Sequence, residues 1–282
     1  MIDTIVEPGE PGVIRYEKRG RVAHFIIDGP NDLNPMSPDM YREWYEHLVD
    51  FRDDKDLWVG LIEGAGSRCF TAGGDLKKAS DIARTFTQQS ASEHFWYPRS
   101  SEPMTTPQIS IEMLALEIYK PMIAAVHGLC LGAGLVFMLA LTDIRVASAD
   151  AKFGFPEIKL GAGGAGAVAD AARRLPFTTA MWLCLTGENI DAAEALRIGL
   201  VNEVVSGESL HDRAQEIADL ICANSPVAVK FEKEAILRSH EMDRSDMLRL
   251  AKMFFFARNQ FHDTQEGLAS FQEKREPKYR GW

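Results

Sequence analysis

The sequence predicts an α/β fold followed by a helical C-terminal region. Up to about residue 205, short apolar runs typical of buried strands alternate with segments of helical periodicity. Beyond that point only helical patterns remain, at about 211–223, 226–239, 244–261 and 263–273. We therefore expect a core domain at 1–205 and a helical region at 206–282.

The first elements are a hairpin and a helix. Strand-like runs at 13–17 and 22–27 flank a turn at Arg19-Gly20. His24 alternates with apolar neighbours, so we expect it to lie on a strand face rather than to bind a ligand. Ser37-Pro38 then supplies the N-cap and first position of a helix that ends near residue 50.

The rest of the core continues the alternation. Short apolar runs predict strands at 57–62, 122–126, 143–147 and 200–205. Helical periodicity predicts helices at about 108–119, 132–141, 168–175, 178–185 and 191–199. Residues 83–109 are less regular and rich in aromatic residues and proline. A long loop of this kind is either functional, often as a lid, or partly disordered, and both readings stay open.

Two glycine-rich turns carry the clearest functional signal. Gly132-Ala133-Gly134 follows the strand at 122–126 and opens a helix, and Ala72-Gly73-Gly74 precedes another helix expected from about Asp75. Small residues let the backbone approach a ligand, and the first amides of a helix lack an internal partner. Two such turns can direct two N–H groups at one oxygen, which is the geometry of an oxyanion hole. The alternative is that the glycines only permit tight packing.

Composition excludes several classes of partner. The chain has 282 residues, 46% of them hydrophobic, and a net charge of −10. That length and apolar content suit one large α/β domain with an appendage. An acidic protein repels nucleic acids and anionic membrane surfaces, so we expect neither as a partner.

Cysteine usage and the N-terminal segment indicate a cytoplasmic protein. The four cysteines (Cys69, Cys130, Cys184 and Cys222) lack the spacing of metal ligands, so we expect reduced thiols and no metal site. The first ten residues are acidic and unlike a signal peptide. No apolar run approaches the roughly 18 residues that a membrane helix needs.

Glu157 is the titratable residue most typical of an acid/base group. It lies in Phe153-Gly-Phe-Pro-Glu-Ile158, among apolar neighbours and just before a glycine-rich turn. Apolar surroundings raise the pKa of a carboxyl group and let it exchange protons near neutrality. A glutamate that caps a helix or forms a salt bridge would fit the same pattern, and this alternative stays open.

Six segments occur in an order that is typical of one superfamily. They are Asn34-Pro-Met-Ser-Pro38, Phe70-Thr-Ala-Gly-Gly-Asp-Leu-Lys77, Lys120 to Leu135, Phe153-Gly-Phe-Pro-Glu-Ile-Lys-Leu-Gly161, Leu185 to Asn202 and Glu273-Lys-Arg-Glu-Pro277. In this order they resemble the crotonase (enoyl-CoA hydratase/isomerase) superfamily over nearly the full chain.

The resemblance implies a crotonase-like spiral of ββα units with a C-terminal helical trimerisation region that completes the acyl-CoA site. It implies an acyl-CoA substrate, no cofactor beyond that coenzyme A moiety, and a homo-oligomer that is a trimer or a dimer of trimers. The oxyanion amides map onto Gly74 and Ala133, and the acid/base glutamate onto Glu157. Substrate contacts are expected at Arg68, Ala72, Asp75, Leu76, Lys77, Gly132 and Lys274, although each basic residue also fits an ordinary solvated charge. Phe254–Phe256 is too apolar for a solvated helix and predicts subunit contacts or a ligand wall.

The chain departs from the family at one catalytic position. Hydratases of the superfamily use two glutamates, and the first maps onto Val136, with no carboxylate between 135 and 141. One base suits double-bond isomerisation, or C–C bond cleavage through the same enolate; a binding protein without catalysis is a further alternative. The missing group, or a pocket for a bulky or aromatic acyl chain, can come from the aromatic loop or the next helix. The candidates are Glu93, His94, Tyr97, Arg99, Glu112 and Glu117.

Overall fold

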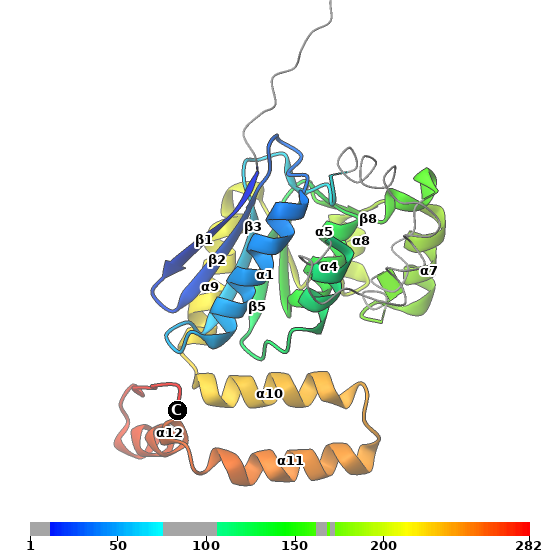
Figure 1. The fold of residues 1–282 in the computed structure, drawn as a ribbon. Coiled ribbons are helices and arrows are strands. Elements are labelled where there is room, and N and C mark those ends of the chain that lie inside the picture. Colours follow the sequence, from blue (N-terminus) through cyan, green and yellow to red (C-terminus); the bar gives the residue numbers. More distant parts are fainter. Residues whose placement is uncertain (1–11, 76–105, 162–167, 170–172) are drawn as a thin grey trace, which may run out of the picture.

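In the computed structural model, which describes residues 12–75, 106–161, 168–169 and 173–282, two β-sheets frame the core (Figure 1). The larger sheet has the order β1-β2-β3-β5-β7-β10 and is parallel except for the β1–β2 hairpin. Its strands are β1 (Val13–Arg19), β2 (Val22–Asp28), β3 (Val59–Gly64), β5 (Met122–Val126), β7 (Ile144–Ser148) and β10 (Glu203–Val205). The smaller sheet has the order β4-β6-β8-β9, with β4 (Cys69–Thr71), β6 (Leu129–Leu131), β8 (Lys152–Gly154) and β9 (Ile190–Asp191).

The chain builds both sheets together. β3 leads directly into β4, β5 into β6 and β7 into β8, so each pair places one strand in the larger sheet and one in the smaller. A helix follows the second and third pairs: α5 (Ala133–Leu141) after β6 and the 3₁₀ helix η1 (Pro156–Leu160) after β8. This repeat confirms the predicted spiral of ββα units.

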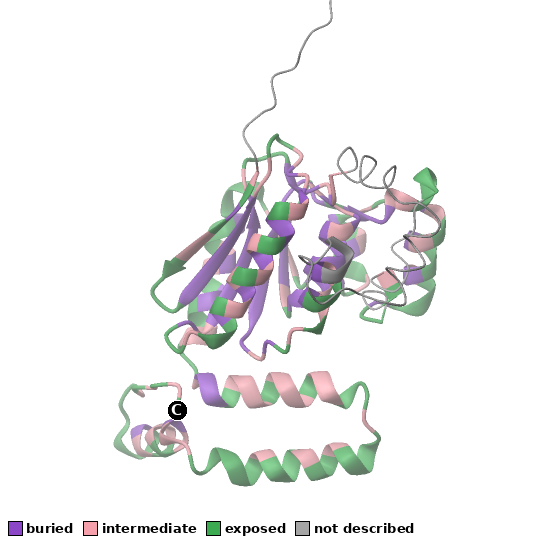
Figure 2. Cartoon of the chain, viewed as in Figure 1, coloured by how far each residue is buried: buried purple, intermediate pink, exposed green. Residues whose placement is uncertain are grey.

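Helices α1 (Pro38–Asp53) and α9 (Leu210–Cys222) cover opposite faces of the larger sheet (Figures 1 and 2). In β5, Ile123 and Ala125 pack in the cluster that includes α9, whereas Ala124 and Val126 pack in the cluster that includes α1. Burial on both faces explains why this strand is a continuous apolar run in the sequence.

The other helices of the core are α4 (Thr106–Ala115), α7 (Phe177–Thr186) and α8 (Ala192–Arg197), with a short 3₁₀ turn η2 (Gly207–Ser209) before α9. The irregular stretch expected to reach residue 109 therefore ends earlier, because α4 begins at Thr106, and α4 stops four residues before its expected end at 119. The strand expected at 200–205 contains only β10, because the amides of Leu200 and Val201 both bond to the carbonyl of Ala195 at the end of α8, at 2.8 and 3.3 Å.

Three C-terminal helices lie apart from the core as a separate layer (Figures 1 and 2). They are α10 (Pro226–Ser239), α11 (Arg244–Arg258) and α12 (His262–Glu273), close to their expected bounds. No residue of α11 is buried. The division at residue 205 stays a prediction, since α9, which follows it, packs on the larger sheet. Among the described helices, none is both long and apolar enough to cross a membrane.

His24 lies on a strand face, as expected, and there it meets a buried glutamate. Its Nδ1 is 2.8 Å from Glu63 Oε2, and Nδ1 of His211 on α9 is 2.6 Å from Glu63 Oε1. Burial alone would raise the pKa of Glu63, but the hydrogen bonds with His211 and His24 lower it to about 2. The same contact raises the pKa of His211. The three side chains therefore connect β2, β3 and α9.

Replacing Glu63 with glutamine is expected to lower the free energy of unfolding by about 2 kcal/mol, because the buried carboxylate loses its charged hydrogen bonds with the two histidines. Glu63 stabilises the fold above its ordinary pKa of 4.5, and this is lost as the pH falls through about 2. His211 stabilises the fold below its ordinary pKa of 6.5, and this is lost as the pH rises through its raised pKa. Urea denaturation from pH 4 to 8 should therefore show the largest wild-type advantage between about 4.5 and 6.5. An equal difference at every pH would contradict the ionic role of the pair.

Candidate active site

The first glycine-rich turn is held by the segment that precedes α1. Asn34 adopts a left-handed conformation with φ of 46°. Its Nδ2 donates to the carbonyls of Cys69 and Ala65 at 2.7 and 2.9 Å, and its Oδ1 accepts from the Gly29 amide at 3.0 Å. These bonds tie the start of α1 to β4, which delivers the chain into the turn.

The turn itself is fixed on both sides. Thr71 Oγ1 donates to the carbonyl of Asn34 at 2.6 Å and accepts from the Gly73 amide at 3.0 Å. Met36 forms a short parallel β-bridge with the turn. Its amide donates to the Gly73 carbonyl at 2.8 Å, and its carbonyl accepts from the Asp75 amide at 2.9 Å. Neither of these two hydrogen bonds uses the amide of Gly74.

The second turn opens α5. Gly132 has φ of 55° and ψ of −128°, and its amide donates to the carbonyl of Gly154 in β8 at 2.9 Å. α5 begins at Ala133, so the amide of Ala133 is among the first N–H groups of a helix, which have no acceptor within the helix. Nine apolar or small residues without a polar side chain make up this helix, and all but two of them are buried.

The two turns lie against each other. A Cβ atom built on Gly73 would lie 2.8 Å from the carbonyl oxygen of Leu131 and 3.2 Å from the amide nitrogen of Ala133. A Cβ atom built on Gly134 would lie 2.3 Å from Thr71 Cγ2, so only glycine fits at this position of α5. The two turns therefore lie close together, as the prediction requires, and the glycines permit the close packing that was its alternative; the meeting of the two amides at one oxygen stays a prediction.

Glu157 lies at the junction of these turns. It is the second residue of η1, and its Oε1 would be 2.0 Å from a Cβ on Gly132. Burial raises the pKa of Glu157, and the backbone amides of Glu157 and Ala133 offset this only in part. Oε2 has no hydrogen-bond partner and the carboxylate no ion pair in the part of the chain that is described. A carboxyl group in this state can take up and release a proton near neutral pH.

Sequence reasoning missed Tyr41. This residue of α1 is 4% exposed, and its hydroxyl oxygen lies 3.5 Å from the position of a Cβ on Gly74. Burial and then the charge of Glu157 raise the pKa of the phenol. The only feature of the sequence that could have pointed to Tyr41 is its position beside Met40, on the apolar face of the helix.

The other predicted site residues divide into three groups. Ala72 belongs to the first turn and Asp75 directly follows it, and Val136 is buried in α5, a helix without a carboxylate. Glu112 is exposed on α4, Arg68 is exposed before β4, and Lys274 ends α12, which lies at the opposite end of the molecule from β8 (Figure 1). Glu117 pairs with Arg238 of α10 at 3.4 Å. Leu76, Lys77, Glu93, His94, Tyr97 and Arg99 lie outside the described residues.

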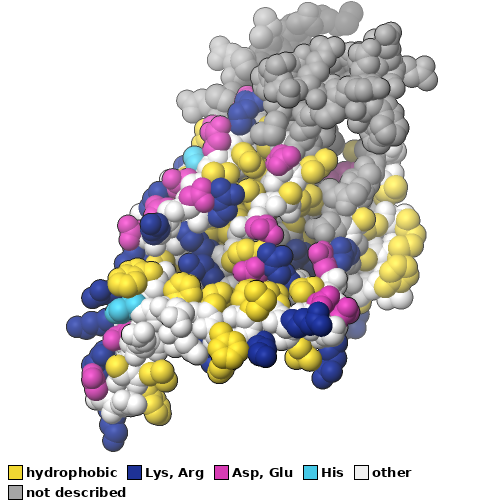
Figure 3. All heavy atoms as spheres, turned by 60° about the horizontal axis from the view of Figure 1, so that its bottom comes forward, with side chains coloured by type: hydrophobic (Ala, Val, Ile, Leu, Met, Phe, Trp, Pro, Cys, Tyr) yellow, Lys and Arg dark blue, Asp and Glu magenta, His cyan; other side chains and the backbone are white. Residues whose placement is uncertain are grey.

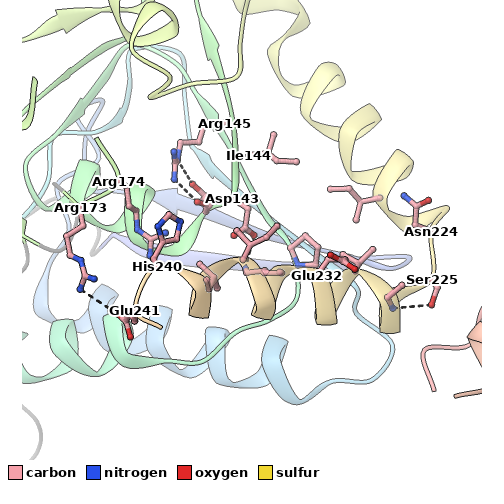
Figure 4. A pocket seen from close by; sticks show the side chains of 18 of the residues that line it. Asp143, Ile144, Arg145, Arg173, Arg174, Asn224, Ser225, Glu232, His240 and Glu241 are labelled. Atoms are coloured by element: carbon pink, nitrogen blue, oxygen red, sulfur yellow. Dashed lines mark hydrogen bonds and ion pairs between the residues drawn. The ribbon is translucent and has the colours of Figure 1, made fainter. Parts of the chain in front are cut away.

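A cavity of about 1150 Å³ lies between α10 and the end of the core, away from the turns (Figure 4). Asp143 and Arg145 line one side, and Glu232, His240 and Glu241 of the helical region line the other. None of the predicted site residues lines it. No group of histidine, cysteine and acidic residues in the described ranges is arranged to hold a metal ion.

Comparison with known proteins identifies the family. Residues 17–281 match the family described as enoyl-CoA hydratase/isomerase. The chain belongs to this family. This hydratase/isomerase family member is 30% identical over 269 residues to the (E)-benzylidenesuccinyl-CoA hydratase of Thauera aromatica, covering 95% of this chain and 99% of that protein. It is 34% identical to the short-chain-enoyl-CoA hydratase of Clostridium acetobutylicum, covering 92% and 94%.

The solved structures agree with this assignment. The enoyl-CoA hydratase from Bacillus anthracis superposes on the hydratase/isomerase family member with a TM-score of 0.83 at 28% identity, covering 95% of this chain and 99% of that one. The predicted crotonase fold and superfamily are thus confirmed. The protein is an enzyme of the hydratase/isomerase class.

Proposed function

We propose that this enzyme transforms an acyl-CoA through an enolate whose oxygen is bound by the amides of Gly74 and Ala133, with Glu157 as the acid/base. The observation that carries the proposal is the position of the Glu157 carboxylate, directly against Gly132 where the two turns meet. Membership of a family that acts on CoA thioesters supports the substrate class.

In this proposal the backbone amides stabilise charge and Glu157 transfers the proton. Two peptide N–H groups stabilise negative charge on the thioester oxygen as it develops, and each such donor is typically worth about 3 kcal/mol of barrier. The raised pKa of Glu157 lets the carboxyl group move a proton to or from the acyl chain. No cofactor beyond the coenzyme A of the substrate is needed for these steps. We also propose a cytoplasmic location, consistent with the unpaired, widely spaced cysteines.

A single carboxylate limits the reaction. Val136 occupies the position where the superfamily's hydratases carry another glutamate, and it is buried among apolar side chains. We therefore favour reactions in which one base serves both proton transfers, or in which another group holds the water. C–C bond cleavage through the same enolate is the second candidate, since it also needs only one base.

Mass spectrometry in D₂O separates these reactions. Purified protein is incubated with saturated, 2-enoyl, 3-enoyl and aryl-enoyl CoA thioesters. Addition of water identifies a hydratase, deuterium gain without water identifies a one-base isomerase, and loss of an acyl fragment identifies a lyase. Binding of every thioester without any mass change would overturn the catalytic proposal and favour a binding protein.

We propose further that the C-terminal helices hold subunits together as a trimer or a dimer of trimers. Hydrophobic side chains are exposed on this layer (Figure 3), and in α11 each of Leu248, Met253, Phe255 and Phe256 is about half exposed or more. A soluble monomer rarely exposes such a patch. A neighbouring subunit would also explain how Lys274 reaches an acyl-CoA, since α12 is remote from η1 within one chain (Figure 1).

Light scattering after size exclusion is expected to give three or six chains per particle. Replacing Phe255 and Phe256 together with serine should shift the particle toward the mass of one chain, because two exposed aromatic contacts are lost. Ile111, exposed on α4 of the core, is a matched control: Ile111→Ser should leave the mass unchanged. A wild-type protein with the mass of one chain would contradict the proposal.

A further inference from the structure

Tyr41 lies on α1 and packs against α5, the helix that begins at the second turn. Its ring packs on Phe137 of α5 with centroids 5.6 Å apart, and Trp44, one turn along α1, packs on the same ring at 5.6 Å. The start of α1 is fixed by Ser37, whose side chain caps the helix, and by the bridge from Met36 to the first turn. The position of the phenol is therefore coupled to that of the Gly74 amide.

The hydroxyl group of Tyr41 points at the first turn. Its oxygen is the nearest atom to a Cβ built on Gly74, at 3.5 Å. Burial and the charge of Glu157 are the influences on the pKa of this hydroxyl, and no hydrogen bond is among them. Buried tyrosine hydroxyl groups usually have a partner. A group of a bound ligand at Gly74 would supply one.

The electrostatic surroundings keep this hydroxyl a donor. Burial raises the pKa of the phenol, and the negative charge of Glu157 raises it further. The group therefore stays protonated at physiological pH. A neutral O–H donor beside a developing oxyanion gains strength as the negative charge grows, without giving up its proton.

We propose that the Tyr41 hydroxyl donates a hydrogen bond to the substrate oxygen held at the Gly74 amide, and so is a third donor of the oxyanion site. This inference rests on the proposed enolate function. No proton leaves the tyrosine; proton transfer stays with Glu157. The side chain thus supplies polar stabilisation in a site where Val136 contributes none.

The test uses acetoacetyl-CoA, whose enolate form absorbs in the near ultraviolet. The pH at which the bound ligand becomes an enolate measures how well the site stabilises the oxyanion. Tyr41→Phe is expected to weaken enolate stabilisation about 10- to 100-fold, which moves this midpoint up by about one to two pH units. It should lower kcat for the true substrate with little change in KM. Tyr45→Phe, the same change one turn later on α1, should move neither quantity.

The outcomes are distinguishable. An unchanged midpoint in folded Tyr41→Phe overturns the inference while leaving the enolate proposal intact. A wild-type protein that binds acetoacetyl-CoA without stabilising its enolate overturns the proposed function itself. If Tyr41→Phe does not fold, 3-fluorotyrosine placed at position 41 keeps the volume and makes the hydroxyl a stronger donor. That substitution should move the midpoint down, and no movement would again overturn the inference.

Discussion

Replacing Glu157 with glutamine is expected to lower kcat by about 100- to 10,000-fold, the usual contribution of a general acid/base. Glutamine has nearly the same shape as glutamate, so the space against Gly132 stays filled. It cannot accept a proton, however, and the structure offers no second carboxylate on α5. Steady-state kinetics on the substrate found in the D₂O panel, with calorimetric titration of CoA, measures both effects. Binding of CoA should be retained.

Glu188→Gln is the matched control. Glu188 is exposed and pairs with Lys159 at 2.8 Å, close to η1 but outside the junction of the two turns. The same change of charge there should leave kcat unaltered. If both variants lose activity equally, the loss reflects the charge of the region rather than proton transfer by Glu157.

The pH dependence of kcat/KM should carry the signature of the same carboxyl group. Burial raises the pKa of Glu157 above its ordinary value of 4.5. When the carboxylate acts as the base, activity is present above this raised pKa and falls as the pH decreases through it. The acidic limb should disappear in the residual activity of Glu157→Gln. An acidic limb that persists in this variant would assign the titration to another group.

Gly132→Ala is expected to reduce kcat by about 100-fold, because a displacement of about 1 Å at a catalytic group costs that much. The added Cβ would lie 2.0 Å from Glu157 Oε1 and 2.8 Å from its Cδ, so the carboxylate must move. The φ of 55° also adds strain of about 1–3 kcal/mol for any residue with a Cβ. Activity and thermal denaturation together separate the two effects.

Gly20→Ala is the control that measures the backbone strain of a positive φ without a steric clash. Gly20 has φ of 59° in the β1–β2 turn, and a Cβ there meets no atom within 4 Å. Both variants should lose stability, Gly132→Ala more because its Cβ also meets the Glu157 carboxylate, but only Gly132→Ala should lose activity. Full activity in Gly132→Ala would show that the carboxylate position seen here is not the one used in catalysis.

Local sequence patterns predicted the elements that carry the site. The continuous apolar run at 122–126 indicated a strand buried on both faces, and β5 is such a strand. The glycine-rich turns were predicted to lie together, and a Cβ built on Gly73 would lie 3.2 Å from the amide nitrogen of Ala133. Such features can be predicted because a short segment decides each of them: burial of a strand sets its composition, and a backbone turn with positive φ favours glycine.

What the sequence left out depends on distant contacts. Tyr41 and Gly74 are brought together by the packing of α1 against α5, which no periodicity encodes. Glu63 was not singled out, because its partners His24 and His211 lie on other elements. Conversely, the buried surroundings of Glu157 were expected from its apolar neighbours alone, and burial is the largest influence on its pKa.

Two donors of the proposed oxyanion site, the amides of Gly74 and Ala133, belong to the peptide backbone, and this affects how the protein can change over evolutionary time. A substitution alters a side chain but keeps the peptide N–H, unless the new residue is proline. Most inherited changes at this site therefore leave the stabilisation of negative charge in place. Side chains such as Val136 are free to vary around the two amides. Single substitutions can therefore change the acyl group that is bound or the residue that moves a proton, while the backbone stabilisation of the enolate is kept.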